Sequence, residues 1–166
     1  MARLSNPGGR ISTLERMGQS IWLDYIHRSM LGSGELKQLI ENSGVRGVTS
    51  NPTIFEQAIG GSTVYDDSIA RLAAGGNDGQ AIYEALAIED IRSAADLFRP
   101  IFDMSDGNDG FVSMEVSPRL AHDTAATIAE AQRLWTALAR PNVLIKIPGT
   151  MEGLPAVTQA IAEGIS

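Results

Sequence analysis

Cysteine is absent from the 166-residue sequence, and so is any long hydrophobic run. The lack of cysteine excludes disulfides, thiolate metal sites and cysteine nucleophiles, and it fits a reducing, cytoplasmic location. Because no apolar run has the length of a membrane span, we expect no transmembrane segment. The arginines within residues 1–10 have no hydrophobic stretch behind them, so we do not expect a signal peptide.

Basic residues are scarce as well. The sequence has 13 lysines and arginines against 20 aspartates and glutamates, which gives a formal net charge of -7. Nucleic acids and anionic membranes are bound through basic patches, so neither is expected as a partner. With 43% hydrophobic residues, the chain is large enough to form one substantial core.

The remaining pattern is an alternation of strands and helices. Runs rich in β-branched and aromatic residues predict strands at 20–26, 47–53, 110–118 and 142–149. Apolar residues at helical spacing predict helices at 11–18, 34–44, 53–61, 64–76, 78–105, 124–141 and 153–166. Pro100 is expected to interrupt the longest of these helices.

This order predicts an α/β fold in which a parallel sheet is covered by helices. Residues 1–18 form an expected N-terminal arm and short helix, and residues 54–109 an expected helical insertion between the second and third strands. Both a doubly wound open sheet and a (β/α) barrel fit this order. A complete barrel takes about 250 residues, so the chain, 1–166, would supply roughly the first four βα units of one.

Each predicted strand carries a polar residue near its carboxyl end, on the face opposite its mainly apolar side. Alternate residues of a strand share a face. This rule places Asp24, Asn51, Glu115 and Lys146 together where the carboxyl ends of parallel strands meet, which is where sites assemble in such sheets. On the same faces lie Thr49 and Ser113.

Each of these residues also has a structural interpretation. Lys146 alone could belong to an edge strand with its ammonium group in water, and Glu115 could be its structural ion partner. Asp24 could cap a turn, and Asn51 precedes a proline. Together they suit one chemistry: a desolvated lysine becomes a nucleophilic amine that forms a Schiff base with a carbonyl, and carboxylates transfer protons.

Four segments resemble the transaldolases: SIWLDYIHR (20–28), GVTSNPTIF (47–55), SMEVSP (113–118) and VLIKIPGTMEGL (143–154). The similarity runs from about Gly18 to the end of the chain. It is strongest to the longer bacterial members, some of which are fused to glucose-6-phosphate isomerase. The resemblance implies a (β/α)8 barrel of the TIM type and a cytoplasmic enzyme of the non-oxidative pentose phosphate pathway.

The resemblance also implies the reaction and the residue roles. A dihydroxyacetone unit would pass from a ketose phosphate, sedoheptulose 7-phosphate or fructose 6-phosphate, to an aldose phosphate, without a metal or organic cofactor. Lys146 would form the Schiff base, Asp24 would accept the proton of the C4 hydroxyl, and Glu115 would act through a bound water. Three side chains would contact the donor: Asn51, Thr49 and, as the weaker candidate, Ser113.

The family's later strands, five to eight, have no counterpart in the sequence, and neither do the arginines that grip the substrate phosphate. We therefore expect a fragment whose partner is the missing C-terminal half of the barrel and which has little activity alone. Two alternatives stay open. One is a compact lysine-dependent aldolase in which two half barrels pair as a homo-oligomer, and the other is a non-catalytic βα binding module.

Overall fold

The computed structural model describes residues 10–166, in which four parallel strands form one sheet. The strands are β1 (Ile21–Leu23), β2 (Val45–Val48), β3 (Phe111–Glu115) and β4 (Val143–Lys146). They lie side by side in chain order, and each pairs in parallel with the next. The predicted parallel α/β architecture is therefore confirmed. The predicted N-terminal arm over residues 1–9 lies outside the described residues.

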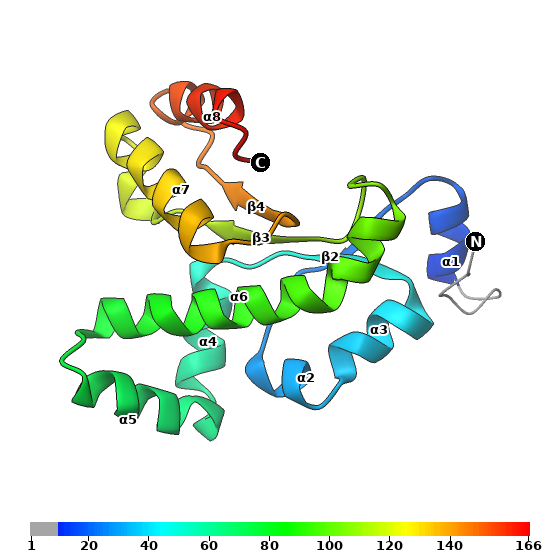
Figure 1. Cartoon of the computed structure of the whole chain (residues 1–166), viewed down its shortest axis with the longest axis horizontal. Helices are drawn as coiled ribbons and strands as arrows, with labels where there is room; N and C mark the ends of the chain where they lie inside the picture. The colour runs from blue at the N-terminus through cyan, green and yellow to red at the C-terminus, as the bar shows by residue number, and fades with distance from the viewer. Residues whose placement is uncertain (1–9) are drawn as a thin grey trace.

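Helices connect and cover the strands (Figure 1). They are α1 (Arg10–Arg16), α2 (Arg28–Gly32), α3 (Glu35–Ser43), α4 (Pro52–Gly60), α5 (Asp66–Ala74), α6 (Gly79–Met104), α7 (Thr124–Leu138) and α8 (Gly153–Ala162), with short 3-10 turns η1 (Thr63–Tyr65) and η2 (Pro118–Leu120). Helix α6 packs along β2 and β3, and α7 packs against β4 and α8. Within residues 10–166, no helix combines the length and apolar character that crossing a bilayer demands.

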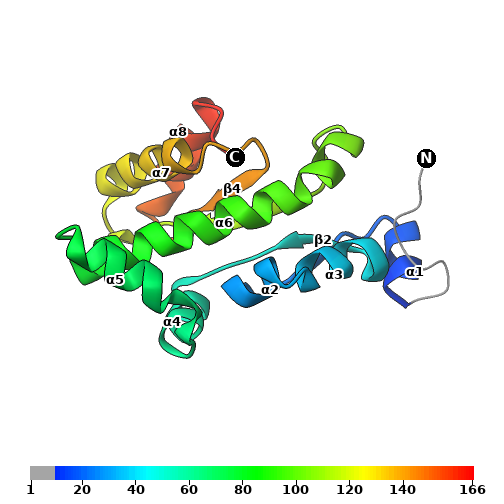
Figure 2. The same ribbon diagram turned by 60° about the horizontal axis from the view of Figure 1, so that its bottom comes forward.

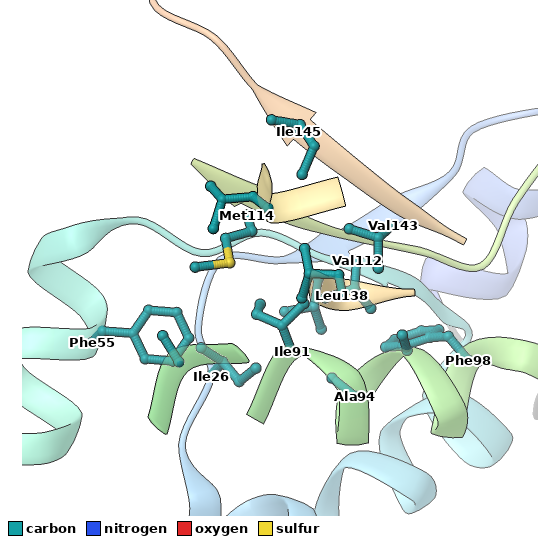
Figure 3. Close-up of a cluster of buried hydrophobic side chains, with 14 of the residues drawn as sticks. Ile26, Phe55, Ile91, Ala94, Phe98, Val112, Met114, Leu138, Val143 and Ile145 are labelled. Atoms are coloured by element: carbon teal, nitrogen blue, oxygen red, sulfur yellow. The ribbon is translucent and has the colours of Figure 1, made fainter. Parts of the chain in front are cut away.

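The core lies between the sheet and α6. Figure 3 shows Ile91, Ala94 and Phe98 of this helix meeting Val112 and Val143 of the strands, and all five side chains are fully buried. Small alanines on this face of α6 let the helix backbone approach the sheet closely. The apolar strand faces that the sequence predicted for β3 and β4 are therefore the faces that contact the helices.

Helix α6 is not interrupted at Pro100, contrary to the prediction. Pro100 is exposed and lies inside the helix, which continues to Met104. A proline removes one backbone hydrogen bond, but on the solvent side water can satisfy the carbonyl that loses its partner. An ion pair of 2.7 Å between Arg99 Nε and Asp103 Oδ1 also spans the proline.

All four strands end earlier than predicted, β3 at Glu115 and β4 at Lys146, and the ends of β1 and β2 affect the site. Strand β1 ends at Leu23 instead of residue 26, so its alternation breaks: Ile26 enters the core, whereas Tyr25 is 47% exposed. Strand β2 ends at Val48, because Asn51 accepts a hydrogen bond from the Ile54 N–H and thereby starts α4. The short α2 was not predicted, since its five residues show no detectable periodicity.

The outer edge of β4, opposite β3, forms a hydrogen bond with the backbone that follows α8. The Ile145 N–H donates to the carbonyl oxygen of Ser166 over 2.7 Å, and the Ile165 side chain is 6% exposed against the core. Figure 2 shows α7 and α8 together beside β4, with the chain end nearby. A single backbone hydrogen bond therefore joins β4 to the residues that follow α8.

Candidate active site

Lys146 and Glu115 form one half of the candidate site. The two residues are direct partners in the register of β3 and β4, and Lys146 Nζ lies 3.1 Å from Glu115 Oε2. The backbone reinforces the pair, because the Val116 N–H donates to the Lys146 carbonyl oxygen over 3.1 Å. An amine and a carboxylate at this distance can exchange a proton directly.

Asp24 and Thr49 form the other half. The Thr49 hydroxyl donates to Asp24 Oδ1, and the Thr49 N–H donates to the Leu23 carbonyl oxygen over 2.9 Å. Asp24 directly follows β1 and is exposed. The threonine therefore fixes the orientation of a solvent-accessible carboxylate.

Asn51 has a structural role that differs from the turn position the sequence suggested. Its side-chain oxygen caps α4 by accepting from the Ile54 N–H over 2.9 Å. Asn51 also lines a small cavity together with Glu115, Tyr83 and Phe55. Its side chain is thus held rigidly beside one of the predicted proton-transfer groups, while the donor contact stays a prediction.

Ser113 lies deeper in the sheet than the other predicted residues. Its side chain is buried, and within residues 10–166 its hydroxyl has no hydrogen-bond partner. Its carbonyl oxygen accepts from the Ser50 hydroxyl over 2.7 Å, which ties the end of β2 to β3. This bond holds the two halves of the site next to each other.

The four polar residues selected by strand alternation lie at or just beyond the carboxyl ends of the four strands. Glu115 and Lys146 contact each other, Asp24 contacts Thr49, and Asn51 caps α4. Their catalytic roles stay predictions. The expectation of a dry lysine is not met in the described residues: the Lys146 side chain is 38% exposed and the Glu115 side chain 26% exposed. The inner face of four strands is open, so this part of the chain does not supply the desolvation.

A cavity of about 390 Å³ lies beyond Glu115, between α4, α6 and α7. Tyr83 and Arg119 line it, and neither was singled out from the sequence. Burial raises the pKa of the Tyr83 phenol, and the nearby carboxylates of Glu115 and Glu56 raise it further. A phenol in this state is protonated at neutral pH and is a hydrogen-bond donor beside the site.

The histidines and the acidic residues give no sign of a metal centre. His27 caps α2 by accepting from the Ser29 N–H, and His122 Nδ1 lies 3.2 Å from Glu152 Oε2 at the surface. In the part of the chain that the structure describes, no three histidine or carboxylate side chains are grouped as metal ligands would be.

A family model described as Transaldolase/Fructose-6-phosphate aldolase matches residues 21–166. A curated protein named Transaldolase from Trichodesmium erythraeum is 50% identical over 153 residues, which cover 92% of this chain and 40% of the relative. One of the same name from Acidothermus cellulolyticus is 54% identical over 156 residues, covering 94% and 42%. A third, from Thermobifida fusca, is 49% identical over 159 residues, covering 96% and 43%. The chain thus spans about two fifths of the length of these relatives.

Proposed function

The chain belongs to the transaldolase/fructose-6-phosphate aldolase family, and from this membership we propose that it carries the Schiff-base half of a transaldolase active site. The complete enzyme transfers a dihydroxyacetone unit from a ketose phosphate to an aldose phosphate in the non-oxidative pentose phosphate pathway, in the cytoplasm. The observation that carries the proposal is the 3.1 Å contact between Lys146 Nζ and Glu115 Oε2 beside the Asp24–Thr49 pair.

The residues act in sequence. The Lys146 amine attacks the ketose carbonyl, and Glu115 moves the protons through a bound water as water leaves and the imine forms. Asp24 then accepts the proton of the C4 hydroxyl while the C3–C4 bond breaks, and the electron pair of that bond enters the lysine-bound enamine. The aldehyde product leaves, and an aldose acceptor takes its place.

Three further side chains support the donor in this proposal. Thr49 orients Asp24 and, with Asn51, contacts the donor hydroxyls; Ser113 lies beneath them. The groups that bind the substrate phosphate belong to the later half of the barrel, so the 166-residue chain alone has little activity. That half is the proposed partner.

Borohydride trapping tests the proposal on the full-length gene product. Fructose 6-phosphate and sodium borohydride are added, and the modified lysine is located by mass mapping. This chain has two lysines, Lys146 and Lys37, and the Lys37 side chain is 63% exposed on α3. We expect a reduced adduct on Lys146, its loss in Lys146→Arg, and its persistence in the matched Lys37→Arg variant.

A second assay separates transfer from simple cleavage, since the family description also names an aldolase. A transaldolase releases glyceraldehyde 3-phosphate at a sustained rate only when an aldose phosphate acceptor is present, whereas an aldolase releases free dihydroxyacetone without one. We expect acceptor dependence. The absence of any adduct on Lys146 would instead favour a non-catalytic module.

A further inference from the structure

Asp90 is a charged residue in the middle of α6 whose side chain is 2% exposed. Both of its carboxylate oxygens are engaged. Oδ1 accepts from Arg28 Nε over 2.8 Å, and Oδ2 accepts from the Tyr65 hydroxyl over 2.8 Å. An ionised carboxylate is costly to bury, and it is retained only where its partners compensate for the lost hydration.

The partners of Asp90 hold the backbone of the segment after β1 as well as a side chain. Arg28 is the first residue of α2, and its backbone N–H donates to the Tyr65 hydroxyl oxygen over 3.0 Å. Its guanidinium lies 4.7 Å from the centre of the Tyr65 ring and also donates to Glu89 over 2.9 Å. A merely stabilising ion pair needs the side chain alone, whereas this cluster fixes the main chain at residue 28.

The segment held in this way begins at Asp24. Thr49 holds its near end through the Asp24 carboxylate and the Leu23 carbonyl. The cluster of Arg28, Tyr65 and Asp90 holds its far end. Between these points the Ile26 side chain has no exposed surface, and Figure 3 shows it next to Ile91 of α6.

The direction of the hydrogen bonds in the cluster follows from burial. Burial raises the pKa of the Tyr65 phenol far above its ordinary value, so the hydroxyl keeps its proton at neutral pH. Tyr65 therefore donates to Asp90 and accepts from the Arg28 N–H. Burial also raises the pKa of Asp90, although the hydrogen bonds from Tyr65 and Arg28 oppose that effect. These three residues form a continuous chain of hydrogen bonds from α6 to the start of α2.

We propose that Asp90, acting through Tyr65 and Arg28, is a positioning residue that holds the Asp24 carboxylate in line with the C4 hydroxyl of the bound donor. The proposal rests on the function assigned to Asp24 above. It gives the helices between β2 and β3 a role in the reaction, because both Tyr65 and Asp90 come from that region. A small displacement of a reacting group can cost roughly 100-fold in rate.

The test is Asp90→Asn in the full-length gene product, with the isosteric amide leaving the packing volume unchanged. We expect kcat to fall about 10- to 100-fold with KM for the donor within about twofold, since Lys146 and the donor contacts are untouched. Borohydride should still trap an adduct on Lys146. Its mass should shift from the three-carbon to the uncleaved donor form, because cleavage is the step that Asp24 serves.

Two controls separate positioning from stability. Asp96→Asn makes the same substitution on the same helix but removes only a surface pair with Arg140, and it should match the parent in kcat and adduct mass. Glu15→Gln removes the partner of the 8%-exposed Arg46 side chain at the opposite end of the sheet. It should lower Tm without shifting the adduct mass.

Tyr65→Phe removes a single hydroxyl and serves as the test if Asp90→Asn does not fold. It should shift the adduct mass in the same direction, towards the uncleaved donor. The proposal is overturned if either folded variant has a lower Tm than the parent but the same kcat and adduct mass. It is also overturned if the variants lose the Lys146 adduct altogether. If the parent itself forms no adduct, the proposed function fails first and the inference fails with it.

Discussion

Gly47 lies directly against the indole ring of Trp22, its register partner in the neighbouring strand. A Cβ atom on residue 47 would come within 2.5 Å of two ring atoms of Trp22 and 2.9 Å of the Phe111 carbonyl oxygen. Trp22 and Phe111 stack with ring centres 6.5 Å apart at 17°. The two aromatic rings fill the space that a side chain of β2 would occupy on the inner face of the sheet.

Gly47→Ala should therefore destabilise the fold by about 1–3 kcal/mol, because neither the ring face nor the backbone can yield cheaply. Urea unfolding followed by tryptophan fluorescence measures this change. Gly79→Ala is the matched control, since a Cβ there meets no atom within 4 Å and alanine favours the first turn of α6. Equal midpoints for the two variants would contradict the packing argument.

Glu115→Gln should slow both the formation and the hydrolysis of the Lys146 imine, by roughly 100-fold or more, because the amide cannot accept a proton. Rapid-quench borohydride trapping measures the rate at which the adduct appears. The adduct should still reach the parental yield after long incubation, since the nucleophile is intact. Glu163→Gln, an exposed change at the residue that follows α8, should leave the rate unchanged. A parental rate in Glu115→Gln would remove Glu115 from the proton path.

Asp24→Asn should block cleavage of the C3–C4 bond while leaving imine formation intact. The trapped adduct on Lys146 should then carry the whole donor, and release of the aldehyde product should fall by at least roughly 100-fold. Intact-mass analysis distinguishes the two adducts directly. Asp67→Asn on the exposed surface of α5 is the control. A three-carbon adduct in Asp24→Asn would show that another group takes the proton.

Asp96 should make the stability depend on pH in the acid range. The hydrogen bond from Arg140 lowers the pKa of Asp96 below its ordinary 3.8. Ionised Asp96 therefore stabilises the fold above that value, and this contribution is lost as the pH falls through the folded-state pKa. The pair is largely solvent-exposed, so Asp96→Asn should cost less than about 1 kcal/mol near neutral pH.

Urea unfolding of the parent and Asp96→Asn at decreasing pH checks this prediction, since the two free energies of unfolding should converge on acidification. Arg140→Gln removes the other partner and should converge with the parent over the same range. In the double variant the two losses should not add, because they remove one interaction. A pH-independent difference would mean that the substitution acts through something other than the ion pair.

Strand alternation predicted the positions of Glu115 and Lys146 because β3 and β4 are regular up to these residues. It failed after Leu23, where the strand ends and Ile26 turns into the core. Asp24 was still placed at the correct edge, because it is the first residue beyond β1. The alternation pattern thus predicted that the polar groups meet at the carboxyl ends of the strands. The resemblance to the family predicted their roles.

The cluster around Asp90 was not predicted, although one feature of the sequence indicates it. Asp90 falls at helical spacing with Leu86, Ala87 and Ala94, so a carboxylate interrupts the buried face of α6. That spacing indicates a buried charge. It does not identify Arg28, 62 positions away, as the partner, because such a contact depends on how α2 and α6 pack.

The order of the strands in the sheet has a consequence for synthesis on the ribosome. Because spatial neighbours follow one another in the chain, each strand that emerges can add to the edge laid down just before it, and none has to be inserted between strands already paired. Long-range pairing, the slow step of most parallel sheets, is thereby divided into short successive closures. The strand added last provides the edge for the next pairing, and on β4 the backbone donor at this edge is the Ile145 N–H.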